Sequence, residues 1–89
     1  MNFNVKLTNT AQKEYRRLPT KVKRQVTNAL DALEKDPRMG SPLHGRLKNY
    51  WSYHTGNYRV VYEIDDSNKV VTIEHIKHRK DVYRDMLRR

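Results

Sequence analysis

Residues 50–64 read YWSYHTGNYRVVYEI and predict a β-hairpin. The segment from Tyr50 to Thr55 is rich in aromatic residues and the segment from Tyr58 to Ile64 in β-branched ones, and strands are enriched in both types. Between them, Gly56-Asn57 is a two-residue turn signal that fits a type II′ turn, with glycine at the first central position. Because a third β-rich run follows from Val70 to Ile76, the second half of the chain predicts a meander of three strands.

The chain before this hairpin predicts one strand and two helices. Apolar and polar residues alternate from Phe3 to Leu7, as on a half-buried strand. Thr8 or Asn9 can cap a following helix, Pro19 ends that helix, and Thr20 can cap the next one. The apolar stripes of the two helices are Ala11, Tyr15 and Leu18, and then Val22, Val26, Ala29, Leu30 and Leu33. The helices therefore form a hairpin whose apolar side must cover the sheet.

The predicted fold is α+β, with the element order β-α-α-β-β-β-α in a single domain of residues 1–89. The helical hairpin packs on one face of a mainly antiparallel sheet, residues 38–48 form a loop, and residues 81–87 form a short C-terminal helix. The pattern in residues 70–76 leaves the core side of that strand open. Two sets compete for it: Val71 with Ile73, and Val70 with Ile76.

The composition favours a polyanionic partner. The 89 residues hold 19 Lys and Arg against 10 Asp and Glu, a formal net charge of +9, and no cysteine. The lack of cysteine excludes a disulfide scaffold, a cysteine-based zinc site and an iron–sulfur cluster. No apolar run reaches the roughly 18–20 residues that span a bilayer, and the N-terminus has no signal-peptide core, so we expect a cytoplasmic protein without a membrane partner. The charge points first to nucleic acid.

Basic and aromatic residues are interleaved in a stretch without acids. No Asp or Glu lies between Asp36 and Glu63, and a further basic cluster follows at residues 75–80. Cations for phosphates beside rings for bases are typical of single-stranded RNA sites. The same pattern also fits a solvated basic surface around a small aromatic core. The expected RNA contacts are Arg46, Lys48, Lys77, His78 and Lys80.

One reaction that such residues can perform without a metal is the cleavage of RNA by its own 2′-hydroxyl group. It needs a base for the 2′-hydroxyl, cations for the charge on the phosphate, and an acid for the leaving 5′-oxygen. His54 is a candidate base, because imidazole titrates near neutral pH. Arg59 and Arg79 are candidates for holding the phosphate, and Tyr83 can stack on a base or donate a proton.

Simpler roles compete with this interpretation. The candidate base can be a surface histidine beside a turn, and Arg59 can form an ion pair across strands with Glu63 or Glu74. No cofactor is expected: His75 and His78 have a metal-like spacing, but residues three apart at a strand end point to opposite faces.

Three segments together form a specific pattern: Pro42 to Lys48, Tyr50 to Tyr62, and His78 to Tyr83. They resemble the RelE/ParE toxin superfamily in its RelE branch. The family pattern reads P-L-x-G-x-L, then W-x-Y-R-x-G-D-Y-R-V-x-Y, then I-x-H-R-x-x-V-Y. The resemblance covers nearly the whole chain, including the helical hairpin.

The resemblance implies the toxin of a type II toxin–antitoxin module, which binds the ribosomal A site and cleaves mRNA there without a metal. Arg59 matches the catalytic arginine of the G-D-Y-R motif. Arg79 lies in the H-R motif near the second catalytic arginine, and Tyr83 matches the C-terminal tyrosine that works with the substrate base.

The sequence departs from the family pattern at three positions. His54 stands where the pattern has Arg or Lys, Asn57 replaces Asp, and Lys77 replaces Gly. His54 keeps a group that can act as a base. The family's usual base is lysine, and its substitutes here would be Lys48 or Lys77.

A toxin implies a cognate antitoxin and a toxin–antitoxin hetero-oligomer. We expect an acidic antitoxin to cover the basic cleft or to displace the last helix and so pull Tyr83 away. The apolar face of that helix, which the antitoxin would contact, is formed by Val82, Met86 and Leu87. Two other functions stay open. One is a toxin of the ParE branch that poisons DNA gyrase, and the other is a protein that binds the ribosome or RNA without cleavage.

Overall fold

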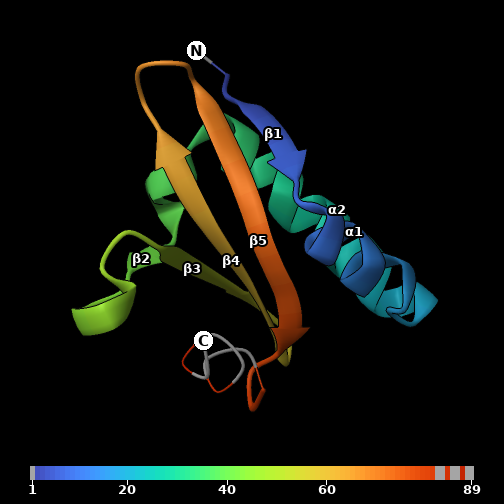
Figure 1. The fold of residues 1–89 in the computed structure, drawn as a ribbon. Coiled ribbons are helices and arrows are strands. Elements are labelled where there is room, and N and C mark those ends of the chain that lie inside the picture. The colour runs from blue at the N-terminus through green and yellow to red at the C-terminus, as the bar shows by residue number, and fades with distance from the viewer. Residues whose placement is uncertain (1, 82–83, 85–86, 88–89) are drawn as a thin grey trace.

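In the computed structural model, which describes residues 2–81, 84 and 87, a twisted sheet lies against two helices (Figure 1). The helices are α1 (Asn9–Arg16), α2 (Thr20–Lys35) and the 3₁₀ turns η1 (Pro37–Met39) and η2 (Gly45–Leu47). The strands are β1 (Asn4–Leu7), β2 (Ser41–Pro42), β3 (Trp51–Thr55), β4 (Tyr58–Asp65) and β5 (Val70–His78).

The five described strands form a mixed sheet in the order β1-β5-β4-β3-β2. β1 pairs parallel with β5, and the other neighbours are antiparallel, which confirms the mainly antiparallel sheet. The loop predicted at residues 38–48 is partly wrong, because it contains β2. This strand is two residues long and holds Pro42, which cannot donate to a ladder and is tolerated because β2 is the edge strand.

The predicted hairpin is confirmed. β3 and β4 pair from Thr55 with Tyr58 back to Trp51 with Tyr62, around the turn Gly56-Asn57. Gly56 has φ +60°, whereas Asn57 does not have a positive φ. A positive φ at only the first turn position fits type II′ and explains why that position is glycine.

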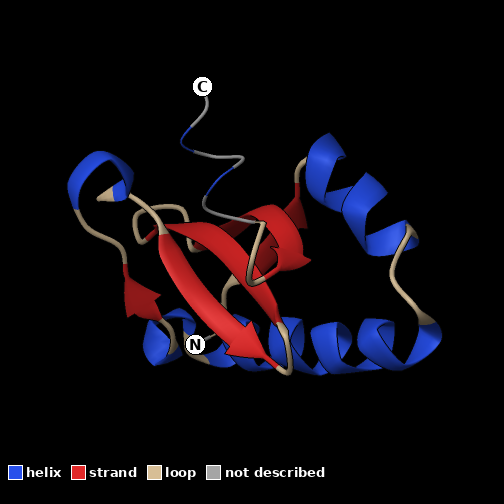
Figure 2. Cartoon of the chain, turned by 90° about the horizontal axis from the view of Figure 1, so that it is seen from below, coloured by secondary structure: helices blue, strands red, loops and turns tan. Residues whose placement is uncertain are grey.

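The sheet has a first face, which packs on the helices, and a second face on the opposite side (Figure 2). The apolar stripes of α1 and α2 pack on the first face. The buried residues of this core are Phe3, Ala11, Leu18, Val26, Leu33, Val60, Tyr62, Val71, Ile73 and Ile76. α1 is capped by Thr8, whose hydroxyl accepts from the backbone N–H of Ala11. The cap predicted for the second helix is wrong: Thr20 is its first residue, and Pro19 precedes it without a side-chain hydrogen bond.

A β-bulge answers the question of which residues of β5 face the core. Val61 of β4 pairs with His75, but the next residue, Tyr62, pairs with Ile73, so Glu74 is an extra residue on β5. The bulge reverses the alternation. Ile73 before it and Ile76 after it therefore both lie buried on the first face.

The turn η1, which follows α2, is held to the sheet by Tyr62. Its phenol donates a hydrogen bond to the carbonyl of Pro37, and burial raises the pKa of Tyr62 to about 12. Gly40 lies beside this contact, where a Cβ would come within 2.6 Å of the Ser52 carbonyl oxygen and also meet the Tyr62 hydroxyl. A side chain at residue 40 would therefore push η1 away from β3.

The predicted helix over residues 81–87 lies largely outside the described residues, and Val82, Tyr83 and Met86 are among those not described. Leu87 is described and is 42% exposed. Within residues 2–81, no helix is long and apolar enough to cross a membrane.

Candidate functional site

Three basic side chains form a row across the second face. His54 on β3 is in register with Arg59 on β4, which is in register with Lys77 on β5. Residues directly opposite on neighbouring strands point to the same face, with Cβ atoms about 5 Å apart. His54 is exposed, whereas Arg59 and Lys77 are half-buried. The hairpin predicted from sequence therefore does bring the candidate base beside a candidate phosphate-binding arginine.

Arg59 is held by a neighbour that sequence reasoning missed. Its Nη1 donates to the hydroxyl of Ser52 at 3.4 Å, from two residues before His54 on β3. Among the residues that the structure describes, no carboxylate pairs with Arg59. The ion pair considered as an alternative is therefore wrong, and within the described part of the chain the guanidinium keeps most of its donors for another anion.

The two glutamates considered as partners of Arg59 pair with each other instead. The hydrogen bond from Glu74 and burial raise the pKa of Glu63 to about 7, because two adjacent carboxyl groups resist ionising together. The bulge brings Glu74 into this position. Glu63 is four residues along β4 from Arg59, a distance of about 13 Å, so the pair lies away from the row.

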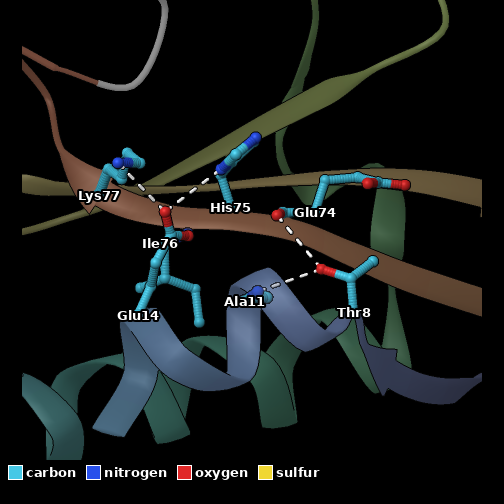
Figure 3. Close-up of polar contacts among 7 residues, drawn as sticks. All are labelled: Thr8, Ala11, Glu14, Glu74, His75, Ile76 and Lys77. Carbon is cyan, nitrogen blue, oxygen red and sulfur yellow. Dashed lines mark hydrogen bonds and ion pairs between the residues drawn. The ribbon is translucent and has the colours of Figure 1, made fainter. Parts of the chain in front are cut away.

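Lys77 is anchored at the edge of the sheet. Its Nζ lies 3.2 Å from Glu14 Oε2, and the same oxygen lies 3.3 Å from His75 Nδ1 (Figure 3). Burial alone would raise the pKa of Glu14, but hydrogen bonds from His75, the Ile76 N–H and Lys77 outweigh it and lower the pKa below its ordinary value. α1 thus places a carboxylate whose ionised form is favoured at one end of the row.

The C-terminal end of β5 lies beside the turn between β3 and β4. The backbone N–H of Arg79 donates to the carbonyl of Asn57 at 2.9 Å, which brings the exposed Arg79 beside the β3–β4 turn. His78 instead lies on the first face, with its ring 5.6 Å from that of Tyr58. His75 and His78 thus lie on opposite faces of β5, as predicted, and the exposed Lys80 follows.

The other predicted RNA contacts lie on η2, outside the row. Arg46 is exposed, and its Nη2 donates to the backbone carbonyl of Leu87 at 3.4 Å. Lys48 is exposed at the end of the same turn. This contact places Leu87 near a basic loop. Tyr83, the other predicted site residue of the C-terminal segment, lies outside the described residues.

The row offers cations and one imidazole but few ligands for a metal. Within residues 2–81, 84 and 87, no three His, Asp or Glu side chains are grouped as a metal site would require. The imidazole can accept a proton, and the guanidinium can bind two oxygens of one phosphate. Ser52 and Glu14 carried no signal in the sequence, because their roles depend on pairings 7 and at least 61 residues apart in the chain.

The chain is similar in sequence to known toxins. A family model described as "ParE toxin of type II toxin-antitoxin system, parDE" matches residues 5–83. Toxin RelG of Mycobacterium tuberculosis is 36% identical over 86 residues, which are 94% of this chain and 99% of the relative. Toxin RelE of the same organism is 37% identical over 84 residues, which are 92% of this chain and 87% of the relative.

The fold is similar to solved toxin structures. The toxin–antitoxin complex RelBE2 of Mycobacterium tuberculosis contains a chain with a TM-score of 0.83 and 32% identity, covering 89% of this chain and 100% of that one. The isolated RelE toxin of E. coli has a TM-score of 0.76 and 24% identity over 97% of this chain and 96% of that one. At that identity the second likeness concerns the fold alone.

Proposed function

Because the chain belongs to the RelE/ParE toxin superfamily and is a toxin of the RelE family of type II toxin–antitoxin systems, we propose that it is an endoribonuclease that cleaves mRNA in the ribosomal A site. The observation that carries the proposal is the row on the second face. His54, Arg59 and Lys77 stand in register on three adjacent strands, and the arginine has no carboxylate partner among the described residues.

The row suits an attack by the 2′-hydroxyl on the adjacent phosphate. His54 takes the proton of the 2′-hydroxyl as the oxygen forms its bond to phosphorus. Arg59 and Lys77 stabilise the negative charge that builds on the phosphate oxygens. The bond from phosphorus to the 5′-oxygen then breaks, and that oxygen receives a proton from an acid. The products are a 2′,3′-cyclic phosphate and a free 5′-hydroxyl, and no metal is needed.

Two further side chains are proposed to act on the phosphate, Arg79 and Tyr83. Arg79 is tied by its backbone to Asn57, two residues before Arg59, and stays exposed. Tyr83 follows it in sequence and carries the phenol that the family pattern uses against the substrate base. We assign Arg79 to binding the phosphate and Tyr83 to donating the proton that the leaving 5′-oxygen receives.

The proposed partners are a cognate antitoxin, the ribosome and mRNA. The Mycobacterium tuberculosis structure that shares 32% identity is a RelBE2 toxin–antitoxin complex, and a RelE–RelB complex of Pyrococcus horikoshii has a TM-score of 0.72. An acidic antitoxin would neutralise the row and the basic η2 turn by covering them. Val82, Met86 and Leu87 are its proposed apolar contacts.

A second candidate function is supported by the family model, which is described as a ParE toxin. Such a protein would poison DNA gyrase and leave mRNA intact. A third is a toxin that occupies the ribosome without cleaving mRNA. The row favours cleavage over both, because gyrase binding gives no reason to place a base beside a guanidinium that has no carboxylate partner among the described residues.

Primer extension on ribosomes translating a defined mRNA tests the proposal. The purified protein should produce cuts within the A-site codon, and a replacement of that codon's riboses by 2′-deoxyriboses should abolish them. Ribosome binding without cuts would favour the non-catalytic toxin. Intact mRNA together with DNA breaks after induction would favour the gyrase poison.

A further inference from the structure

The first turns of α1 close an open edge of the sheet. β1 pairs with β5 only from Val70 to Ile73, so the edge of β5 beyond that point has no partner among the described strands. Glu14 Oε1 accepts the backbone N–H of Ile76 at 2.9 Å, and the hydroxyl of Thr8 donates to the carbonyl of Glu74 at 3.4 Å (Figure 3). The side chains of Glu14 in α1 and of its N-cap Thr8 thus replace the missing strand and fix the helix against β5.

The second oxygen of the same carboxylate reaches toward the row. Glu14 Oε2 lies 3.2 Å from Lys77 Nζ, and the two side chains are 14% and 28% exposed. An ion pair with this little exposure is screened weakly by solvent. His75, from the same strand as Lys77, also contacts this oxygen and is 7% exposed. One carboxylate therefore both fixes α1 against β5 and contacts a cation of the candidate site, Lys77.

Lys77 needs such an anchor because of its neighbours. Arg59 faces it across β4 and β5, and His75 lies two residues away on the same face of β5. The two cations repel each other, and the four-carbon stem of lysine would let the ammonium turn to solvent. Glu14 offsets this repulsion from the other side.

We propose that Glu14 is a positioning residue, which holds the ammonium of Lys77 in the row so that it binds the scissile phosphate beside Arg59. This inference rests on the proposed function, since it gives Lys77 a role toward RNA phosphate.

A double-mutant cycle of Glu14→Gln and Lys77→Gln tests the proposal. Glutamine keeps an oxygen for the Ile76 N–H but removes the charge that holds Lys77. Glu14→Gln should slow single-turnover cleavage on programmed ribosomes about tenfold, within the range of coupling between contacting residues. In the Lys77→Gln background the same change should have no further effect. Equal slowing in both backgrounds would show a merely structural role and overturn the proposal.

Two further measurements separate positioning from stability and from proton transfer. Asp31→Asn, on the exposed side of α2, is the matched control and should leave cleavage unchanged. The acidic limb of the pH–rate profile should stay in place in Glu14→Gln, because it reports on His54. A shift of that limb to lower pH would identify Lys77 as the base and contradict the proposal.

Measuring ribosome binding instead of cleavage for the same variants distinguishes this proposal from the proposed function. The probe is a programmed ribosome whose A-site codon carries 2′-deoxyriboses and cannot be cut. If the wild-type protein binds this probe but does not cut the mRNA of the unmodified ribosome, and Glu14→Gln weakens binding only when Lys77 is present, the positioning role stands and the endonuclease proposal fails. If cleavage occurs but the two residues are uncoupled, the positioning role fails alone. If wild type neither binds nor cuts, both fail.

Discussion

The two faces of strands β3, β4 and β5 differ in what they contribute, although they are built from alternating residues of the same segments. The first face carries Val60, Tyr62 and Ile76, which are buried under the helices. The second face carries the row of His54, Arg59 and Lys77, which are exposed or half-buried. Replacing a residue on the first face should reduce stability, whereas replacing one in the row should reduce activity with little effect on stability.

The largest expected effect is on the second face. His54→Ala removes the proposed base, and a positioned general base contributes on the order of 10²–10⁴ in rate. The cleavage rate on programmed ribosomes should fall by that factor, while the melting temperature stays within a few degrees of wild type because His54 is exposed. His44→Ala, an exposed histidine outside the row, is the control. Equal activity of the two variants would remove His54 from the mechanism.

The core between the helices and the first face should show the reverse behaviour. Leu33 of α2 is fully buried in the core, and Leu→Ala substitutions at such positions cost about 2–5 kcal/mol. Thermal unfolding of Leu33→Ala should show a fall in the melting temperature of at least about 10 °C. Cleavage measured well below that temperature should be close to wild type. A variant that melts normally but fails to cleave would break the distinction between the faces.

A smaller effect is expected where η1 crosses the end of the core. A Cβ at residue 40 would meet backbone of β3, so Gly40→Ala should destabilise the fold by about 1–3 kcal/mol. Ser41→Ala, next in sequence and exposed, is the control and should unfold like wild type. Chemical denaturation measures both. Equal stability of the two variants would contradict the close packing of Gly40 against Ser52 and Tyr62.

The smallest expected effect is a pH dependence of stability caused by Glu63, which lies on the second face but outside the row. Glu63 has a pKa raised from 4.5 to about 7, so the folded state keeps a proton that the unfolded state loses. Wild-type stability should therefore fall as the pH rises from about 4.5 through 7, and Glu63→Gln should remove that part of the fall. Melting temperatures across this range would test it. Parallel curves for variant and wild type would show that Glu63 and Glu74 do not share a proton.

Glu14 should behave in the opposite way. Its pKa is lowered in the folded state, so its contribution to stability is present above pH 4.5 and is lost as the pH falls below that value. Glu14→Gln should accordingly lose stability at neutral pH and approach wild type in acid. A Glu14→Gln variant as stable as wild type at pH 7 would contradict the edge contacts of α1. Melting temperatures measured over the same pH range thus test both the raised pKa of Glu63 and the lowered pKa of Glu14.

The local features of the fold were predictable from sequence, and the features set by long-range pairing were not. The strand before Thr8, the helical hairpin and the turn at Gly56 each carry their own periodicity or cap, so their signals are local. The short strand β2 carries none, because two residues with a proline form a strand only where an edge is free to pair. The bulge at Glu74 shifts the alternation of inward- and outward-facing residues along β5. No sequence pattern within β5 predicts this shift.

The candidate site divides in the same way. The hairpin register predicts that His54 and Arg59 are neighbours, because both lie the same distance from the turn. The pairing of Lys77 with Arg59 depends on the bulge, and its pairing with Glu14 joins residues 63 apart in the chain. Nor could the sequence show that Arg59 takes Ser52 rather than a glutamate as its partner.

Arg59 and Val60 provide the most direct test, because they are adjacent on β4 and point to opposite faces. Cleavage rate and melting temperature should be measured for Arg59→Ala and Val60→Ala side by side. Arg59→Ala should lose cleavage by on the order of 10²–10⁴ and keep its melting temperature. Val60→Ala should lose about 2 kcal/mol of stability and keep cleavage below its transition. If Arg59→Ala cleaves like wild type, the row on the second face is not the site of the reaction.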